Sequence, residues 1–214
     1  MTNVKDYKKE YKELYSPKTK PMIVDVPEMQ FVAVESRGNP NEENGEYQKS
    51  IEILYGIQYT IKMSKMRNNK LNGYFDYVVP PLEGLWWLDE LDNNGDFSIR
   101  DKSKYCWISL IRLPEFVNGE IFNWACNEVS KKKNIETKNA KYIKIKEGLC
   151  VQCMHIGSYN DEPKTIKIME EFIENNNLKI DLNETRKHHE IYLSDPRKTE
   201  ISKLKTILRI PVRK

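Results

Sequence analysis

The sequence predicts an α+β fold made of two β-α-β-β units related by a pseudo-twofold axis, with the helices packed on one side of antiparallel sheets. Two observations support this. Strand-like and helix-like runs alternate along the chain, and the two halves match each other at both ends of a repeated unit. Each unit is too small to bury a sheet face alone. We therefore expect the units to pair sheet edges or to pack side by side, with a concave seam between them.

The first unit is expected over about residues 28–114. A strand-like run ends at Gly38, and a polar turn leads into a helix from Tyr47 to about Ser64, because apolar residues recur there at helical spacing. Two short strands follow. They are expected at residues 84–88 and 105–112, and the second is followed by Pro114.

The second unit is expected over about residues 140–214, after a connector helix at about 115–131. An offset of 119 residues places Val32 on Val151 and Gly38 on Gly157, which gives the same strand, turn and helix order. The helix should run from Pro163 to about Asn175, and short strands are expected at residues 189–193 and 206–209. Residues 28–214 are thus expected to form a single domain.

Composition and charge exclude several classes of protein. With 39% hydrophobic and 31% charged residues and no long apolar run, we expect no membrane span, and without an apolar leader segment we expect a cytoplasmic protein. Residues 1–20 hold six lysines against three acids, so the remaining 29 bases and 29 acids balance. A balanced body argues against direct nucleic-acid binding. The Lys/Tyr-rich N-terminal arm, residues 1–27, is instead the natural contact for a protein partner.

Three stretches of the second unit resemble a known family. They are residues 155–159 (HIGSY) with the helix after them, 190–196 (EIYLSDP) and 207–212 (ILRIPV), and residues 73–87 of the first unit match a subset of that family. The chain is similar to the GyrI-like (gyrase-inhibitor-like) small-molecule-binding domain family over about residues 28–214. The similarity implies a stand-alone member without a helix-turn-helix, in a subfamily that includes cyclopropanoid cyclopropyl hydrolases.

The resemblance implies several activities. Some members of this kind are hydrolases that detoxify xenobiotics by opening the cyclopropane of DNA-alkylating natural products in an aromatic cage. The implied ligand is a planar aromatic or lipophilic-cationic small molecule, and no cofactor is expected. Other members only bind ligands, inhibit gyrase, or form the effector-binding half of multidrug-responsive transcription regulators. The alternatives are therefore a protein-interaction role such as gyrase inhibition, or ligand sensing without catalysis, since fold alone does not choose the activity.

Glu190 and Tyr192 are the candidate catalytic residues. Alternation along a strand places them on one face. From the sequence alone, a solvated Glu190 or one paired with a neighbouring histidine is slightly favoured, but the resemblance implies a pocket glutamate on this strand. Glu190 would then act as general base or orient a water, and Tyr192 or another hydroxyl would donate to the oxygen on which negative charge develops.

Candidate ligand-binding residues are aromatic. All four tryptophans fall between residues 86 and 124, where they either fill the core of the first unit or line the seam. Superposing the two units places Trp87 opposite Tyr192 and Trp86 in the helix-packed layer. The other candidates are Trp107 and Tyr105, which share a strand face, Trp124 on the connector helix, and Tyr77.

Metal and redox sites are not expected. The three histidines lack ligand spacing. The lone CxxC of Cys150 and Cys153 lies in an apolar, strand-like run, which favours buried thiols over redox or zinc chemistry.

Overall fold

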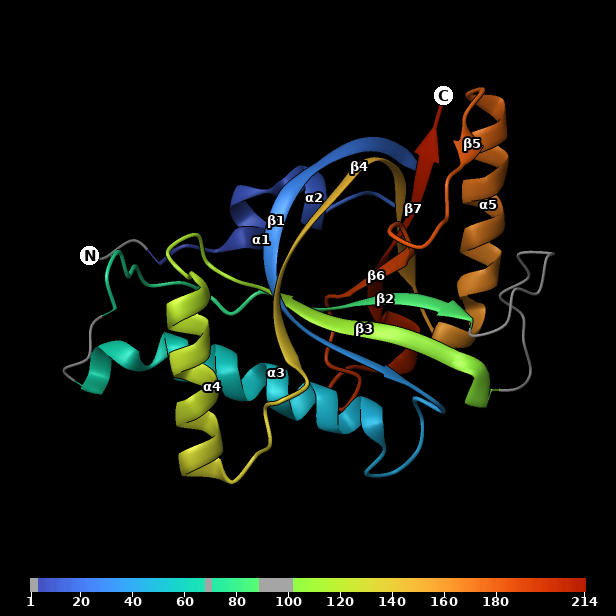
Figure 1. Ribbon diagram of the computed structural model, residues 1–214. Helices are drawn as coiled ribbons and strands as arrows, with labels where there is room; N and C mark the ends of the chain where they lie inside the picture. Colours follow the sequence, from blue (N-terminus) through green and yellow to red (C-terminus); the bar gives the residue numbers. More distant parts are fainter. Residues whose placement is uncertain (1–3, 68–70, 89–101) are drawn as a thin grey trace.

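The computed structural model describes residues 4–67, 71–88 and 102–214. Six of its strands form one closed, barrel-like antiparallel sheet in the order β4-β1-β3-β2-β6-β7, and β7 pairs with β4 to close the ring (Figure 1). A seventh strand, β5, pairs only with β7 among these strands. The strands are β1 (Met22–Arg37), β2 (Leu82–Leu88), β3 (Tyr105–Arg112), β4 (Ala140–Ile156), β5 (Lys179–Ile180), β6 (His188–Tyr192) and β7 (Lys205–Arg213).

The predicted strand-helix-strand-strand order is confirmed in the first half of the chain, and the second half has the same order with one additional short strand, β5, between α5 and β6. In the first half β3 pairs with β1 and β2, and in the second half β7 pairs with β4 and β6. The halves join through β1–β4 and β2–β6. Of the two expected arrangements, the units therefore pair their sheet edges. The pseudo-twofold axis stays a prediction.

Five α-helices accompany this sheet within the described ranges. α3 packs against β1, β3 and α4, and α5 packs against β4. The two long strands β1 and β4 each end before a glycine with positive φ, Gly38 (φ 120) and Gly157 (φ 131), a backbone conformation that glycine adopts without steric cost. The helices are α1 (Tyr7–Glu10), α2 (Lys12–Tyr15), α3 (Glu46–Lys62), α4 (Gly119–Lys133) and α5 (Glu162–Asn175).

The connector helix α4 has clear start and stop signals. The side chain of Asn118 accepts a hydrogen bond from the Ile121 backbone N–H at 2.9 Å, which caps the first turn. Three lysines, at positions 131–133, lie in the last turn, where cations interact favourably with the helix dipole. Asn134, in the left-handed conformation, ends the helix.

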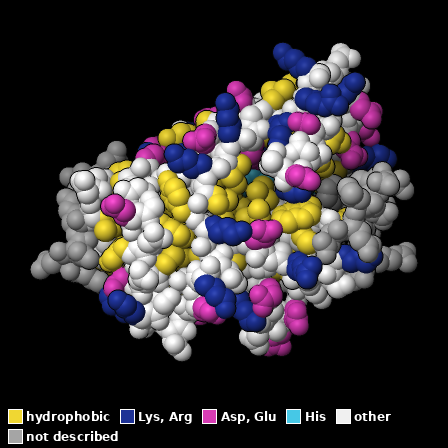
Figure 2. All heavy atoms as spheres, in the orientation of Figure 1, with side chains coloured by type: hydrophobic (Ala, Val, Ile, Leu, Met, Phe, Trp, Pro, Cys, Tyr) yellow, Lys and Arg dark blue, Asp and Glu magenta, His cyan; other side chains and the backbone are white. Residues whose placement is uncertain are grey.

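Successive side chains of the strands point alternately into the barrel and out of it, so they contribute to two packed layers. One set packs in a core to which every strand of the closed ring contributes, so this core fills the interior of the barrel. The opposite set packs outward, under α3 and α4 in the first half and under α5 in the second. On the surface drawn in Figure 2, hydrophobic side chains gather in a central hollow, and basic and acidic side chains are interspersed around it.

The N-terminal arm is part of the barrel core. Tyr7, Leu14 and Tyr15, from α1 and α2, are buried in the interior, while lysines of the arm such as Lys9 and Lys12 face solvent. Removing residues 1–20 would therefore expose the barrel interior as well as delete a charged surface. A protein partner that contacts this arm stays a prediction.

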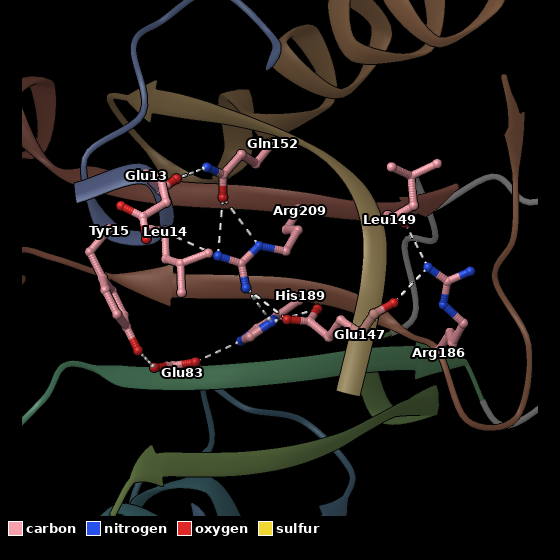
Figure 3. Close-up of polar contacts among 10 residues, drawn as sticks. All are labelled: Glu13, Leu14, Tyr15, Glu83, Glu147, Leu149, Gln152, Arg186, His189 and Arg209. Carbon is pink, nitrogen blue, oxygen red and sulfur yellow. Dashed lines mark hydrogen bonds and ion pairs between the residues drawn. The ribbon is translucent and has the colours of Figure 1, made fainter. Parts of the chain in front are cut away.

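A charged network occupies the barrel interior next to the arm (Figure 3). We call its members Glu83, Glu147, His189 and Arg209 the interior network. Glu147 accepts from Arg209 Nη1 at 2.7 Å and lies 2.9 Å from His189 Nδ1, and His189 Nε2 lies 3.0 Å from Glu83. Arg209 also donates to the Leu14 carbonyl at 3.1 Å. Two carboxylates thus face a guanidinium and an imidazole.

Glu147, His189 and Arg209 stabilise one another's charged forms. Burial opposes ionisation of Glu147, but His189 and Arg209 prevail and lower the pKa of that carboxyl to about 2. Burial likewise opposes a charged His189, but Glu147 and Glu83 raise the pKa of the imidazole to about 9. The imidazole of His189 and the guanidinium of Arg209 are therefore both positively charged near pH 7 and face the carboxylate of Glu147.

Candidate ligand-binding and catalytic site

A second polar cluster lies on the outer face of the same strands. The register of β2 and β6 pairs Gly84 with Glu190 and Trp86 with His188. These residues point away from the interior, because the residues between them, such as Leu85, pack inside. The N-terminal end of α5 lies beside the end of β2 (Figure 1), and Tyr47, near the start of α3, has its ring 5.6 Å from that of Trp86 on β2. We call the following group the outer-face cluster: Tyr47, Trp86, Tyr105, Trp107, Tyr159, Glu162, His188, Glu190 and Tyr192.

Glu190 is the central carboxylate of the cluster. Its side chain is 15% exposed, and its Oε2 accepts a hydrogen bond from the Tyr192 hydroxyl at 2.7 Å. The same hydroxyl accepts from Trp86 Nε1 at 2.9 Å. His188 Nε2 lies 3.4 Å from the other carboxylate oxygen. A chain of donors thus runs from the indole through the phenol to the carboxylate and fixes its orientation.

Tyr192 retains its proton in this chain. Burial, followed by the negative charge of Glu190, raises the pKa of Tyr192 well above its ordinary value. The hydroxyl is therefore a neutral donor across the physiological range.

Aromatic rings surround the carboxylate. The ring centroid of Trp86 lies 5.5 Å from that of Trp107 and 6.1 Å from that of Tyr105. The ring centroid of Tyr47, on α3, lies 5.6 Å from that of each of the two indoles. The cluster reaches the surface at Tyr159, which is 38% exposed and whose ring lies 6.0 Å from that of Tyr192. Such rings can stack on a planar ligand or face a cation.

Gly84 allows this arrangement. A Cβ at this position would lie 2.5 Å from Trp86 Nε1 and 3.2 Å from the Tyr192 hydroxyl. The indole therefore lies across the strand in space that only glycine leaves open, and from there its N–H reaches Tyr192.

The cluster contains a second carboxyl, that of Glu162. It is the first residue of α5, only 8% exposed, and its Oε1 is buried without a hydrogen-bond partner in the described structure. Burial, followed by the charge of Glu190, raises the pKa of Glu162 well above the ordinary value of a glutamate. Burial, followed by the charge of Glu162, in turn raises the pKa of Tyr159 to about 12. The charge of Glu190 thus acts on Glu162, and the charge of Glu162 acts on Tyr159.

The structure brings Glu190, Tyr192, Trp107 and Tyr105 together but corrects the placement of the neighbouring tryptophans. Trp86 lies in the cluster, whereas Trp87 lies on the opposite face of β2, with Lys187 Nζ 4.8 Å from its ring. The reason is the register, because Tyr192 pairs with Leu82 and the Trp86 side chain reaches it diagonally along the strand. Contact of Trp87 with a ligand stays a prediction.

Tyr77 and Trp124 lie outside the cluster. The Tyr77 hydroxyl is 3.3 Å from Gln58 in the barrel core, and Trp124 packs with the residues between α4 and the sheet. Of the two positions considered for Trp124, the structure shows the one that anchors the helix. A hollow of about 670 Å³ lies elsewhere, at the turn after β4, and is lined by Ile156–Ser158, Asp161 and residues 200–202.

Sequence reasoning missed three members of the cluster: Tyr47, Tyr159 and Glu162. Each lies just after the polar turn that precedes a helix of the repeat. An acidic residue at a helix start is ordinarily interpreted as a favourable interaction with the helix dipole. The repeat itself held the signal, because it places the beginnings of both helices on either side of the β2–β6 pair.

Several known proteins are similar to this chain. The model of the GyrI-like small molecule binding domain matches residues 19–213. An uncharacterized conserved protein from Listeria innocua is 47% identical, with 98% of this chain and 100% of that chain covered and a TM-score of 0.90. A structure described as a hydrolase from Listeria innocua is 46% identical, with the same coverage and a TM-score of 0.88.

A further structure, also described as a hydrolase from Listeria innocua, is 46% identical over 99% of this chain and 100% of that chain, with a TM-score of 0.89. No curated protein matches the chain. No helix within the described residues has the length and apolar character to span a membrane. With its family model matched over nearly its whole length, this chain belongs to the GyrI-like small-molecule-binding domain family.

Proposed function

We propose that the outer-face cluster binds planar aromatic or lipophilic-cationic small molecules and hydrolyses the cyclopropane ring of DNA-alkylating natural products. One observation carries the proposal. Glu190 is a partly buried carboxylate that Tyr192 holds in a fixed orientation among aromatic rings. The two similar structures described as hydrolases support the catalytic part.

In this proposal the aromatic rings bind the ligand, and the carboxylate of Glu190 takes part in the reaction. A ligand enters at Tyr159 and stacks against Trp86, which excludes water from one side of it. The carboxylate of Glu190 also attracts the positive charge of a cationic ligand. A planar scaffold held in this way presents a constant edge to Glu190, and such positioning alone lowers a reaction barrier considerably.

The reaction is the addition of water to a strained ring carbon conjugated to a dienone. Glu190 accepts a proton from water as the oxygen–carbon bond forms. The cyclopropane carbon–carbon bond breaks, and its electron pair passes through the ring to the carbonyl oxygen, which becomes a phenol after taking up one proton. Removal of a general base of this kind lowers turnover by roughly 10²–10⁴-fold.

The test uses the parent spirocyclopropyl cyclohexadienone, whose conversion to a phenol changes its ultraviolet absorption. We expect Glu190→Gln to lower kcat by about 10²–10⁴-fold, because the amide cannot accept the proton. Glu170→Gln, at an exposed position of α5, is the matched control and should keep the parental rate. Hydrolysis by Glu190→Gln at the parental rate would exclude Glu190 as the base.

Binding is measured separately from turnover. Intrinsic fluorescence should be quenched when a planar aromatic cation or a cyclopropane-bearing alkylator stacks in the cluster, because Trp86 and Trp107 lie there. Trp86→Phe should lose most of that quenching, whereas Trp124→Phe, which lies outside the cluster in the core between α4 and the sheet, should keep it. Equal quenching in the two variants would contradict ligand binding at the cluster.

A further inference from the structure

The hydrogen bonds of Tyr192 leave no proton for a ligand. A phenol has one proton to donate, and here that proton is directed at Glu190. The hydroxyl oxygen accepts from Trp86. To donate to a ligand, Tyr192 would have to release the carboxylate that it orients. The proton taken up by the dienone oxygen, as that oxygen becomes a phenol, must therefore come from another group of the cluster or from solvent.

Glu162 has the geometry of such a donor. It begins α5, three residues after Tyr159, whose ring centroid lies 6.0 Å from that of Tyr192, and one of its carboxyl oxygens is buried with no partner in the described structure. A buried polar atom without a partner destabilises a folded protein and is uncommon. A ligand oxygen hydrogen-bonded to this carboxyl would remove that destabilisation.

The surroundings favour the neutral form of this carboxyl. The N-terminus of α5 favours an ionised side chain. Burial and the negative charge of Glu190 act in the opposite direction and raise the pKa of Glu162 well above its ordinary value. The other titratable groups at the cluster are Tyr47 from α3, Tyr105 from β3, Tyr159 before α5, and His188, Glu190 and Tyr192 from β6.

We propose that Glu162 is a second catalytic carboxyl, which donates its proton to the dienone oxygen of the ligand while Glu190 accepts a proton from the attacking water. This inference rests on the proposed function. As the ring opens, Glu162 becomes a carboxylate and Glu190 becomes a carboxylic acid, and one proton exchanged between them through solvent restores the starting state. Two carboxyls whose surroundings separate their pKa values can divide acid and base roles in this way.

The test compares Glu162→Gln with Glu170→Gln on the same helix, again with the spirocyclopropyl cyclohexadienone. We expect Glu162→Gln to lower kcat by roughly 10²–10⁴-fold, the usual effect of a general acid. The parental kcat should fall on the alkaline side, where Glu162 loses its proton, and Glu162→Gln should lack this decline. A side chain that merely supports the fold would not remove one limb of the pH profile.

A second measurement needs no ligand. The infrared spectrum of the parental protein at pH 7 should contain the carbonyl band of a buried, protonated carboxyl. The band should be absent from Glu162→Gln and present in Glu170→Gln.

The outcomes separate the two proposals. If the parental protein hydrolyses the probe and Glu162→Gln retains both its rate and its alkaline decline, Glu162 is not the acid and the proposed function stands. If the infrared band is present in both variants, the assignment of Glu162 as the acid is also wrong. If the parental protein hydrolyses no spirocyclopropyl dienone, the hydrolytic function and the catalytic role of Glu162 are both wrong.

Discussion

The interior network and the outer-face cluster are built on opposite faces of the same two strands. On β6, His189 points into the barrel and Glu190 points out, and on β2, Glu83 points in and Trp86 points out. Inside, two carboxylates are matched by an imidazolium and the guanidinium of Arg209. Outside, two carboxyls face aromatic rings and each other, and one of them has a buried oxygen without a partner.

This difference separates stability from chemistry. The ion pairs of the interior network rigidify the barrel interior, and their members are difficult to replace singly. A carboxyl without a partner stabilises nothing in the free protein but remains available to a ligand. Substitutions on the two faces should therefore have opposite signatures, with the larger loss of folding free energy inside and the larger loss of activity outside.

The largest effect on stability is expected for Arg209→Met. The change leaves Glu147 buried with one cation fewer and removes the hydrogen bond to the Leu14 carbonyl. Breaking a buried ion pair costs about 3–5 kcal/mol of unfolding free energy, which urea denaturation would measure. Arg213→Met, at an exposed position in the same strand, should change it by less than about 0.5 kcal/mol. Similar losses in the two variants would contradict a special role for the interior.

The free energy of unfolding should depend on pH through the protonation of His189. Its pKa is raised from 6.5 to about 9, so the folded protein binds the proton more tightly than the unfolded chain does. That contribution is complete below pH 6.5 and is lost as the pH rises through about 9. The loss amounts to about 3 kcal/mol for a shift of this size.

Glu162, whose pKa is also raised, adds to the same decline in stability with increasing pH. His189→Gln should therefore reduce the slope of unfolding free energy between pH 6.5 and 8.5 without abolishing it, and the imidazole of His189 should titrate near pH 9 by nuclear magnetic resonance. A midpoint near the ordinary histidine value would mean that the network is not charged as described.

A pair of glycines tests the outer face. Gly84→Ala places a methyl group 2.5 Å from Trp86 Nε1, so the indole must move, at a cost of about 1–3 kcal/mol in unfolding free energy and with loss of turnover. Gly119→Ala meets no atom within 4 Å at the start of α4 and should be neutral or stabilising by up to about 1 kcal/mol. Thermal unfolding and fluorescence would distinguish the two. Unchanged fluorescence in Gly84→Ala would show that the indole does not depend on this glycine.

The smallest effect on stability is expected for Tyr192→Phe. It leaves Trp86 Nε1 and Glu190 without the hydroxyl between them, which costs about 1–2 kcal/mol. Turnover should fall by more than this loss of stability suggests, because Glu190 is no longer held in one orientation. Tyr59→Phe, at an exposed position of α3, is the control. If kcat is unchanged in Tyr192→Phe, the hydroxyl does not position the base.

The sequence was sufficient for most of the local structure of this protein, although the short elements α1, α2 and β5 were not predicted. The three longer helices, the strands that end at Gly38 and Gly157, and the shared face of Glu190 and Tyr192 all follow from periodicity and turn residues. These signals act over a few positions. They carry information about what a segment forms and about which of its residues point the same way.

Long-range pairing was less accessible. Arg209 and Glu147 are 62 positions apart and meet only because β7 pairs with β4. Trp87 was predicted beside Tyr192 where the structure has Trp86. The superposition of the two units was offset by one residue, and such an offset moves a side chain to the other face of a sheet. Closure of the barrel and insertion of the arm depend on edge pairings that no local pattern specifies.

The bond between Leu14 and Arg209 joins residues 195 positions apart, so the first helices of the chain cannot complete their packing until its last strand exists. During synthesis the apolar side of the arm therefore stays exposed until nearly the whole protein has left the ribosome. A topology with such distant contacts folds slowly and passes through species prone to aggregation. The same contact that secures the finished barrel therefore makes the nascent chain a natural client of chaperones.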